Sequence, residues 1–412
     1  MRLSEADLAM LNGEAGPGAQ MAMELLTAAA PAARATELID IVGAHIDGCL
    51  YHGVAGLDFA RDLAERGARA AVPTTLNVSS IDLIHPDLYR GPEEEARAAR
   101  ELMDAYVTMG CSPTWTCAPY QLAVRPRFGD QVAWGESNAI VFANSVLGAR
   151  TNRYGDFLDI CCAITGRAPA SGLHTDEGRR ATFHLAVRVP DRLLDEELLY
   201  PLLGHVLGQE AGTEVAVISG LDGRADEDRL KSLGAAAASS GAVAMFHVVG
   251  VTPEATTLEE AAGGKDPLRT VVVDVDRLNS ARKSLEVGSG DLTAVSVGTP
   301  HISIRELETL AGLVTGARSK VPFYVNVGRD VLDEASSQQL VEPITKFGAT
   351  LVTDTCTYIT PIMEDLSGVV MTNSGKWAYY APGNIGVQVV MGSLGECVQS
   401  AVSGQVVRGE PW

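Results

Sequence analysis

Three of the seven cysteines lie where a thiolate could bind a metal. Cys117 is in the loop PTWTCAPY, Cys356 follows an apolar strand in VTDTCTYITP, and Cys397 is near the start of a helix in GECVQSAVSG. A lone cysteine is most often a small buried apolar residue. A helix N-terminus, however, stabilises the thiolate, which is the form that binds iron. Three cysteine ligands and one open coordination position would suit an iron–sulfur cluster acting as a Lewis acid, so these three are our candidate metal ligands.

The other four cysteines fit that role less well. Cys161 and Cys162 are adjacent in an apolar, predicted helical stretch. Neighbouring helical residues point to different faces, so we expect both cysteines in the core. Cys49 is compatible with a core or a site position, and Cys111 is a reserve ligand.

The segment GESNAIVFANSVLGARTNR, residues 135–153, is dense in groups that bind anions. If AIVFANSVLGA is a helix, Ser137 and Asn138 cap its N-terminus and Arg150 lies past its far end. The segment is then either a capped helix with a solvated basic end or a loop that binds a carboxylate or phosphate, and we favour the loop. The candidate substrate-binding residues are Ser137, Asn138, Asn144, Arg150, Thr151 and Asn152, with Thr74, Thr75 and Asn77 after another predicted strand.

Five residues are candidates for proton transfer or for polarising a substrate. They are His45 and Asp47 in GAHIDG, Glu136 at the start of the polar segment, His301 in SVGTPHIS, and Lys376 in TNSGKWAYY. A single histidine is more often structural than catalytic, but His301 directly follows a predicted parallel strand. Lys376 is a candidate general acid or carboxylate-binding group.

Strands rich in valine alternate with helices over much of the chain and would position these groups. FHLAVRV, EVAVISG and VAMFHVVG lie within 180–265, and DLTAVSVG, VPFYVNVG and ATLVTDTC lie within 266–370. This alternation predicts an α/β fold with parallel sheets buried on both faces. We expect α/β domains at 180–265 and 266–370, and a third domain in which residues 1–179 are joined by the returning tail 371–412. Polar loops after strand ends are where such sheets bind ligands.

The composition limits the partners. The chain has 412 residues, 32 Lys and Arg, and 52 Asp and Glu, for a net charge of −20. This charge disfavours binding to nucleic acid or to an anionic membrane surface. No apolar stretch approaches the ~20 residues of a membrane-spanning helix, and the N-terminus is unlike a signal peptide. We therefore expect a cytoplasmic protein. The small-molecule carboxylate that we expect as its partner is suggested by the segment 135–153 and not by the net charge.

Several longer motifs together resemble one family. HIDGCLYHG, VPTTLNV, MGCSPTWTCAPYQ, FGDQVAWGESNAIVFANSVLGARTNRYGD, GTPHIS, VTDTC, MTNSGKWAYYAPGN and ECVQSAVSG are similar, in order, to the large subunit of aconitase X. The resemblance spans nearly the whole chain and is weakest over 180–265. It implies a three-domain aconitase-like core with parallel sheets that lacks the superfamily's mobile swivel domain. A small-subunit partner would then supply the swivel.

The resemblance also implies a chemistry. The family members are iron–sulfur hydro-lyases, and their cluster cysteines would fall on Cys117, Cys356 and Cys397. Many relatives have Gly-Cys-Pro-His where this chain has Gly298, Thr299, Pro300 and His301, so the cluster type, 2Fe-2S or 4Fe-4S/3Fe-4S, stays open. The implied reaction is dehydration of cis-3-hydroxy-L-proline to Δ1-pyrroline-2-carboxylate, or alternatively of mevalonate 5-phosphate. The base is implied to be a serine of the swivel domain.

Two other classes of function compete with the hydro-lyase. One is a cluster-free enzyme with a cysteine or histidine nucleophile. The other is a non-catalytic binding protein, for which RNA is disfavoured by the charge of −20 and the lack of a basic stripe.

Overall fold

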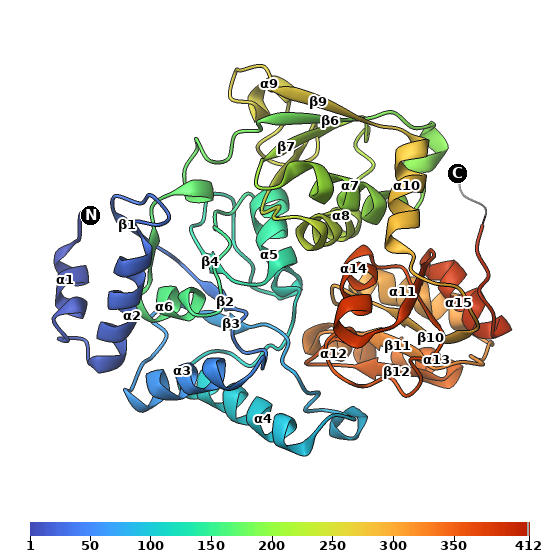
Figure 1. Cartoon of the computed structure of the whole chain (residues 1–412), viewed down its shortest axis with the longest axis horizontal. Coiled ribbons are helices and arrows are strands. Elements are labelled where there is room, and N and C mark those ends of the chain that lie inside the picture. The colour runs from blue at the N-terminus through green and yellow to red at the C-terminus, as the bar shows by residue number, and fades with distance from the viewer. Residues whose placement is uncertain (410–411) are drawn as a thin grey trace.

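Parallel sheets flanked by helices organise the chain into three units (Figure 1). The computed structural model describes residues 1–409 and 412. The first unit is drawn in blue to green, the second in green to yellow, and the third in orange to red. This arrangement confirms the predicted α/β class with parallel sheets.

The first unit surrounds a three-stranded parallel sheet of order β3-β2-β4, beside an antiparallel pair β1-β5. Its own apolar core contains Cys161 and Cys162, as expected. The elements are α1 (Glu5–Leu11), α2 (Pro17–Ala29), β1 (Leu38–Asp40), β2 (Ala44–Ile46), α3 (Val54–Glu65), β3 (Thr74–Leu76), η1 (Pro86–Leu88), α4 (Glu93–Thr108), η2 (Pro119–Gln121), β4 (Ala133–Trp134), α5 (Ser137–Phe142), η3 (Ala143–Leu147), α6 (Leu158–Thr165), β5 (Arg167–Pro169) and η4 (Gly172–His174).

The second unit is a four-stranded parallel sheet of order β8-β7-β6-β9. Its elements are β6 (Phe183–Val187), η5 (Asp191–Asp195), α7 (Leu199–Ala211), β7 (Ala216–Ser219), α8 (Glu227–Ser240), β8 (Phe246–Val248), α9 (Leu258–Ala261), β9 (Arg269–Val273) and α10 (Val275–Leu285). The expected boundary at 265 is corrected, because β9 pairs with β6 over five residues and so belongs to this sheet.

The third unit is a five-stranded parallel sheet of order β12-β11-β10-β13-β14. Its elements are β10 (Leu292–Val297), α11 (Ile304–Val314), β11 (Phe323–Asn326), α12 (Arg329–Ser337), α13 (Val341–Phe347), β12 (Ala349–Val352), β13 (Val369–Thr372), α14 (Gly375–Ile385), β14 (Gln388–Met391) and α15 (Leu394–Ser403). The tail 371–412 therefore does not return to the first unit as expected. Its strands are apolar, and they complete this sheet beside β10 because that pairing satisfies their backbone and buries both faces.

Local signals fix where the helices of the third unit begin and end. Ser303 with Glu306, and Ser393 with Glu396, form capping boxes that start α11 and α15. Gly404 ends α15 with φ 77°, a conformation that favours glycine. Within the described residues, the helices are all too short or too polar to cross a membrane.

Candidate functional site

The carboxyl ends of two parallel sheets face one cleft between the first and third units. Residues after β2, β3 and β4 supply Asp47, Asn77 and Glu136, and residues after β12 and β13 supply the segments that carry Tyr358 and Lys376. Ligands bind at the carboxyl ends of strands in open α/β sheets. The cleft has a volume of about 870 Å³, which is enough for a small metabolite.

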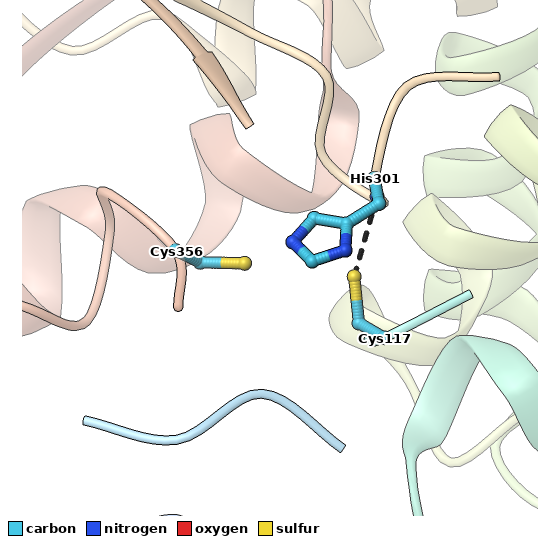
Figure 2. A group of neighbouring side chains, drawn as sticks. All are labelled: Cys117, His301 and Cys356. Carbon is cyan, nitrogen blue, oxygen red and sulfur yellow. Dashed lines mark hydrogen bonds between the residues drawn. The ribbon is translucent and has the colours of Figure 1, made fainter. Parts of the chain in front are cut away.

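Cys117, which lines this cleft, converges with His301 and Cys356 (Figure 2). Their ligand atoms all lie within 4.8 Å of one another, and all three residues are buried. Cys117 comes from the first unit, whereas His301 and Cys356 follow β10 and β12 of the third. The His301 backbone N–H donates to the Cys117 sulfur at 3.3 Å. The structure thus brings together two of the three predicted cysteine ligands.

The surroundings favour a thiolate at Cys117. Burial raises the pKa of this thiol, but the hydrogen bond from Cys356, the positive charge of Lys376 and the His301 N–H outweigh burial, so the pKa lies below its ordinary value. The hydrogen bond that Cys356 donates and its own burial raise the pKa of Cys356 well above the usual range. Two converging sulfurs, one of them poised to ionise beside the cleft, fit a metal group with thiolate ligands.

The His301 ring is held rather than free. Its Nε2 lies 3.4 Å from the Thr355 carbonyl oxygen, which only accepts, so Nε2 carries the proton. Nδ1 then accepts from the Thr116 hydroxyl at 3.1 Å. Burial lowers the His301 pKa to about 4, which keeps the ring neutral. His301, predicted to be catalytic, therefore lies within the buried cysteine–histidine group.

Cys397 lies elsewhere, which corrects its prediction as a ligand. Its side chain is fully buried in the apolar core of the third unit, near Leu394, Val398 and Ala401. The sulfur's hydrogen-bond partner is the Gly392 carbonyl, at 3.9 Å. The helix start that suggested a metal site is instead closed by its own capping box, and the cysteine faces the sheet.

Glu136 and Lys376 form a buried ion pair across the two units. Glu136 also caps α5 by accepting from the Ala139 N–H at 2.8 Å, and it accepts from Ser137 Oγ at 3.0 Å. Asn138 donates to the Cys117 carbonyl at 3.0 Å and accepts from Tyr120 at 2.7 Å. The polar start of this helix therefore positions both the ion pair and the Cys117 loop.

Asp47 is half-buried on the cleft wall and hydrogen bonded to Asn77. Its backbone N–H donates to the buried Asp159 carboxylate at 2.7 Å. Burial, together with the negative charges of Glu136 and Asp156, raises the Asp47 pKa to about 7. This carboxyl group can thus take up or release a proton near neutral pH.

Three predicted site residues support the small sheet instead of lining the cleft. His45 is buried on β2, and its Nδ1 lies 2.8 Å from the Thr75 hydroxyl. Burial lowers the His45 pKa to about 3, so the ring is neutral. Thr74 donates to the Val72 carbonyl at 2.8 Å. The predicted roles of these residues are corrected accordingly.

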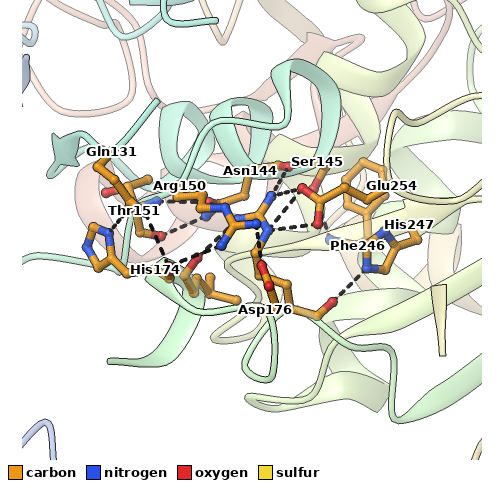
Figure 3. Close-up of polar contacts among 12 residues, drawn as sticks. Gln131, Asn144, Ser145, Arg150, Thr151, His174, Asp176, Phe246, His247 and Glu254 are labelled. Atoms are coloured by element: carbon orange, nitrogen blue, oxygen red, sulfur yellow. Dashed lines mark hydrogen bonds and ion pairs between the residues drawn. The ribbon is translucent and has the colours of Figure 1, made fainter. Parts of the chain in front are cut away.

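Asn144, Arg150 and Thr151 lie in a polar network away from the cleft, shown in Figure 3, and Asn152 is their neighbour in the chain. Arg179 lies there almost without exposure and binds the Glu254 carboxylate through Nε and Nη2. Asn144 bonds to Arg179 and to the Thr151 backbone, while Arg150 pairs with Asp176. Asn152 bonds to the backbone of residues 171 and 173. Asn144 therefore joins the first unit to the second through Arg179 and the Ala244 carbonyl, because a buried guanidinium needs many acceptors. Arg150, Thr151 and Asn152 instead bond to other residues of the first unit.

Arg153, the last residue of the segment 135–153 that was predicted to bind an anion, lines the cleft. Its Nη1 donates long hydrogen bonds to the Ala238 and Val243 carbonyls. Among the residues that the structure describes, no carboxylate oxygen lies within 4.0 Å of the Arg153 guanidinium, so Arg153 forms no ion pair there. Its position three residues after Arg150 was the available signal, but spacing alone does not say which arginine faces the ligand. The cleft residues that were not predicted include Tyr154, Asp156, Tyr358 and Tyr380.

Comparisons with known proteins agree with this fold. Residues 1–177, 183–283 and 292–403 match the Aconitase X first, second and third domains. A cis-3-hydroxy-L-proline dehydratase of Pseudomonas aeruginosa is 44% identical over all of this chain and 71% of its own length. A phosphomevalonate dehydratase large subunit of Thermococcus kodakarensis is 36% identical over 92% of the chain and 95% of its own.

Solved structures give the same answer. The crystal structure of Thermococcus kodakaraensis aconitase X in its holo form superposes with a TM-score of 0.87 and 34% identity, over 97% of this chain and all of that one. The fold and cleft define a three-unit α/β protein with a buried cysteine–histidine group. The chain belongs to the aconitase X family, and its cysteine–histidine group is compatible with the iron–sulfur cluster that this family suggests.

The metal ligands can be tested by substitution. Cys117→Ala and Cys356→Ala should each lose most of the bound iron, because each removes one converging sulfur. Cys397→Ala should keep iron near the wild-type level, at a stability cost of about 1–2 kcal/mol for the small cavity. Iron and sulfide per chain after anaerobic purification give the comparison. Loss of iron from Cys397→Ala equal to that from Cys356→Ala would contradict the assignment.

The Asp47 pKa makes a prediction about stability. Because the carboxyl ionises near pH 4 in the unfolded chain and near 7 in the folded one, the folded state loses stability as pH rises from 4 to 7. Asp47→Asn removes this cost, so it should be more stable than wild type at pH 8, by about 1–2 kcal/mol after allowing for solvent at the cleft. Urea unfolding at pH 4.5 and 8 measures the difference. An equal difference at both values would show that Asp47 ionises normally.

Proposed function

We propose that this chain is the catalytic large part of a hydro-lyase that dehydrates cis-3-hydroxy-L-proline. Two relatives with that activity in their names are 44% and 42% identical to this chain. The relatives named phosphomevalonate dehydratase large subunit are 32–36% identical. The observation that carries the proposal is the balance of charge in the cleft.

The cleft is suited to a zwitterion. Its carboxyl groups are Asp47, Glu136 and Asp156, and its cations are Arg153 and Lys376. Lys376 is neutralised by Glu136, which leaves Arg153 as the group to hold a substrate carboxylate. A secondary ammonium can lie against the remaining acids. Mevalonate 5-phosphate carries a carboxylate and a phosphate but no cation, so it matches this set less well.

The residues of the chain divide the reaction between them. Arg153 binds the substrate carboxylate, which places C2 and its proton in the cleft. Asp47, held by Asn77, is positioned to accept that proton at a carboxylate oxygen. As the C2 proton passes to Asp47, the C3–O bond breaks and the departing hydroxide takes a proton from solvent water in the cleft. Asp47 later releases the C2 proton to solvent, so one water is formed per substrate. The ring enamine then tautomerises to Δ1-pyrroline-2-carboxylate.

Cys117, Cys356 and the Glu136–Lys376 ion pair lie where negative charge would develop. An iron–sulfur cluster held by Cys117 and Cys356 would supply a Lewis acid for the departing hydroxyl. Lys376 lies beside these sulfurs, and its buried charge favours negative charge on the substrate as the C2 proton is lost. Glu136 fixes the position of the ammonium. Tyr358 covers it, with the Lys376 nitrogen 6.0 Å from the ring centre.

We further propose that a small swivel subunit completes the enzyme. The support is that the archaeal relatives matching this chain over nearly their whole length are named large subunits. The swivel would close the cleft, exclude water and contribute a serine that shares proton transfer with Asp47. A cytoplasmic location remains part of this proposal.

Arg153→Ala should raise KM for the substrate by about 10–150-fold with a smaller change in kcat, because it removes charge-assisted hydrogen bonds worth about 1.5–3 kcal/mol. Arg150→Ala is the matched control. It removes an arginine of the same segment that pairs with Asp176 outside the cleft, so its KM should stay within about twofold of wild type. An unchanged KM in Arg153→Ala would remove Arg153 from substrate binding.

The function is tested by co-expressing the chain with a candidate small subunit and reconstituting the cluster without oxygen. The pair should form Δ1-pyrroline-2-carboxylate from cis-3-hydroxy-L-proline and leave mevalonate 5-phosphate unchanged, with little turnover by the chain alone. Faster dehydration of mevalonate 5-phosphate would select the alternative substrate. Full turnover by the isolated chain would refute the need for a partner, and turnover that survives iron removal would favour a cluster-free enzyme.

A further inference from the structure

The loop that carries Cys356 is hydrogen bonded to the first unit at Asp354, two residues before the cysteine. This loop, residues 353–357, follows β12 and contacts residues 79–85 of the first unit. Asp354 is fully buried there and adopts φ 59°, a left-handed conformation that is uncommon outside glycine. Such a conformation costs about 1–3 kcal/mol and persists only where several contacts enforce it.

Asp354 has those contacts. Arg329, at the start of α12, binds both carboxylate oxygens, with Nε and Nη2 each at 2.6 Å. The Leu83 N–H donates to Oδ2 at 3.0 Å, and the Ser79 N–H donates to the Asp354 carbonyl at 2.6 Å. One residue therefore joins its own unit to two points of the first unit. Bidentate pairing also fixes the orientation of the Asp354 carboxylate, because its two oxygens must align with two N–H groups of the planar guanidinium.

Asp82 makes the reciprocal contact from the first unit. It is buried, and its carboxylate accepts from the Thr353 N–H and the Thr353 hydroxyl, both at 2.8 Å. The same carboxylate accepts from the backbone of residues 84 and 85 of its own loop. Each unit thus inserts one buried aspartate into the other's loop. We call this set, Asp82, Arg329, Thr353 and Asp354, the aspartate clasp.

The aspartate clasp lies at the contact between the two units that sets the distance between the Cys117 and Cys356 sulfurs. Cys117 and Cys356 belong to different units, so the distance between their sulfurs depends on how the units meet. The aspartate clasp holds the two units together next to Cys356. Neither Asp354 nor Arg329 lines the cleft, and neither touches the sulfurs, so neither is a ligand.

We propose that Asp354, held by Arg329, is a positioning residue that sets the Cys356 sulfur opposite Cys117 for metal binding. The inference rests on the proposed metal site. It adds that the affinity of this site depends on a charge pair outside it. Substitutions that disturb groups orienting a metal ligand cost about 10–100-fold in metal affinity.

Asp354→Asn is the sharpest variant, because asparagine tolerates the left-handed conformation but loses the charge that Arg329 binds. Arg329→Lys keeps the positive charge but loses the bidentate geometry, and it is the milder second variant. Glu364→Gln is the matched control. It breaks another ion pair between the first and third units, Arg90 with Glu364, which is exposed and lies away from Cys356.

The test titrates each metal-free protein with Co²⁺ and follows the sulfur-to-cobalt charge-transfer band, with thermal unfolding as the check on folding. Wild type and Glu364→Gln should bind alike, Asp354→Asn should bind at least about tenfold more weakly with a shifted band, and Arg329→Lys should fall between. If Asp354→Asn and Arg329→Lys bind Co²⁺ with the wild-type affinity and show the wild-type band, the positioning role is wrong but the metal site stands. A wild-type protein with no cobalt–sulfur band would overturn the metal site and this inference with it.

Discussion

The contact between the first and third units is the constraint on which the site depends. Cys117 reaches the metal group from one unit, and Cys356 and His301 reach it from the other. The two sulfurs can bind the same metal group only if the two units pack in one fixed arrangement. Buried polar contacts enforce this register, including the Glu136–Lys376 pair, the His301 N–H to the Cys117 sulfur, and the aspartate clasp. Such contacts are costly to break, since each leaves an unpaired buried group.

The same junction explains how an acidic protein can hold an anion. The chain carries a net charge of −20, and burial keeps His301 neutral. Lys376 pairs with Glu136, so our proposal assigns the substrate carboxylate to Arg153. Burial and the acidic neighbours of Asp47 raise its pKa to about 7. Local placement of a few charges therefore decides the chemistry, and the overall charge does not.

Sequence patterns predicted the parallel sheets and much of the cleft, because the carboxyl ends of valine-rich strands are readable and must meet at one edge. Asp47, Asn77, Cys117, Glu136, Cys356 and Lys376 all follow such strands or the loops beside them, and the structure brings them together. Cys397 failed because a helix start does not reveal which side chains face the core. Asn144 lies outside the cleft because the buried Arg179 binds the amide that a substrate could have used, and Arg150 lies outside it because it pairs with Asp176. The tail 371–412 was misplaced because its polar loops resemble those of the first unit, and the sequence does not show that β13 and β14 pair beside β10.

The central claim is that the metal lies between the first and third units, on Cys117 and Cys356. A crystal structure of the anaerobically reconstituted protein, with anomalous data collected at the iron absorption edge, tests it most directly. The account predicts a single strong iron peak bonded to both of these sulfurs beside the cleft that contains Arg153. An iron peak at Cys397, or one bonded to neither sulfur, would contradict it.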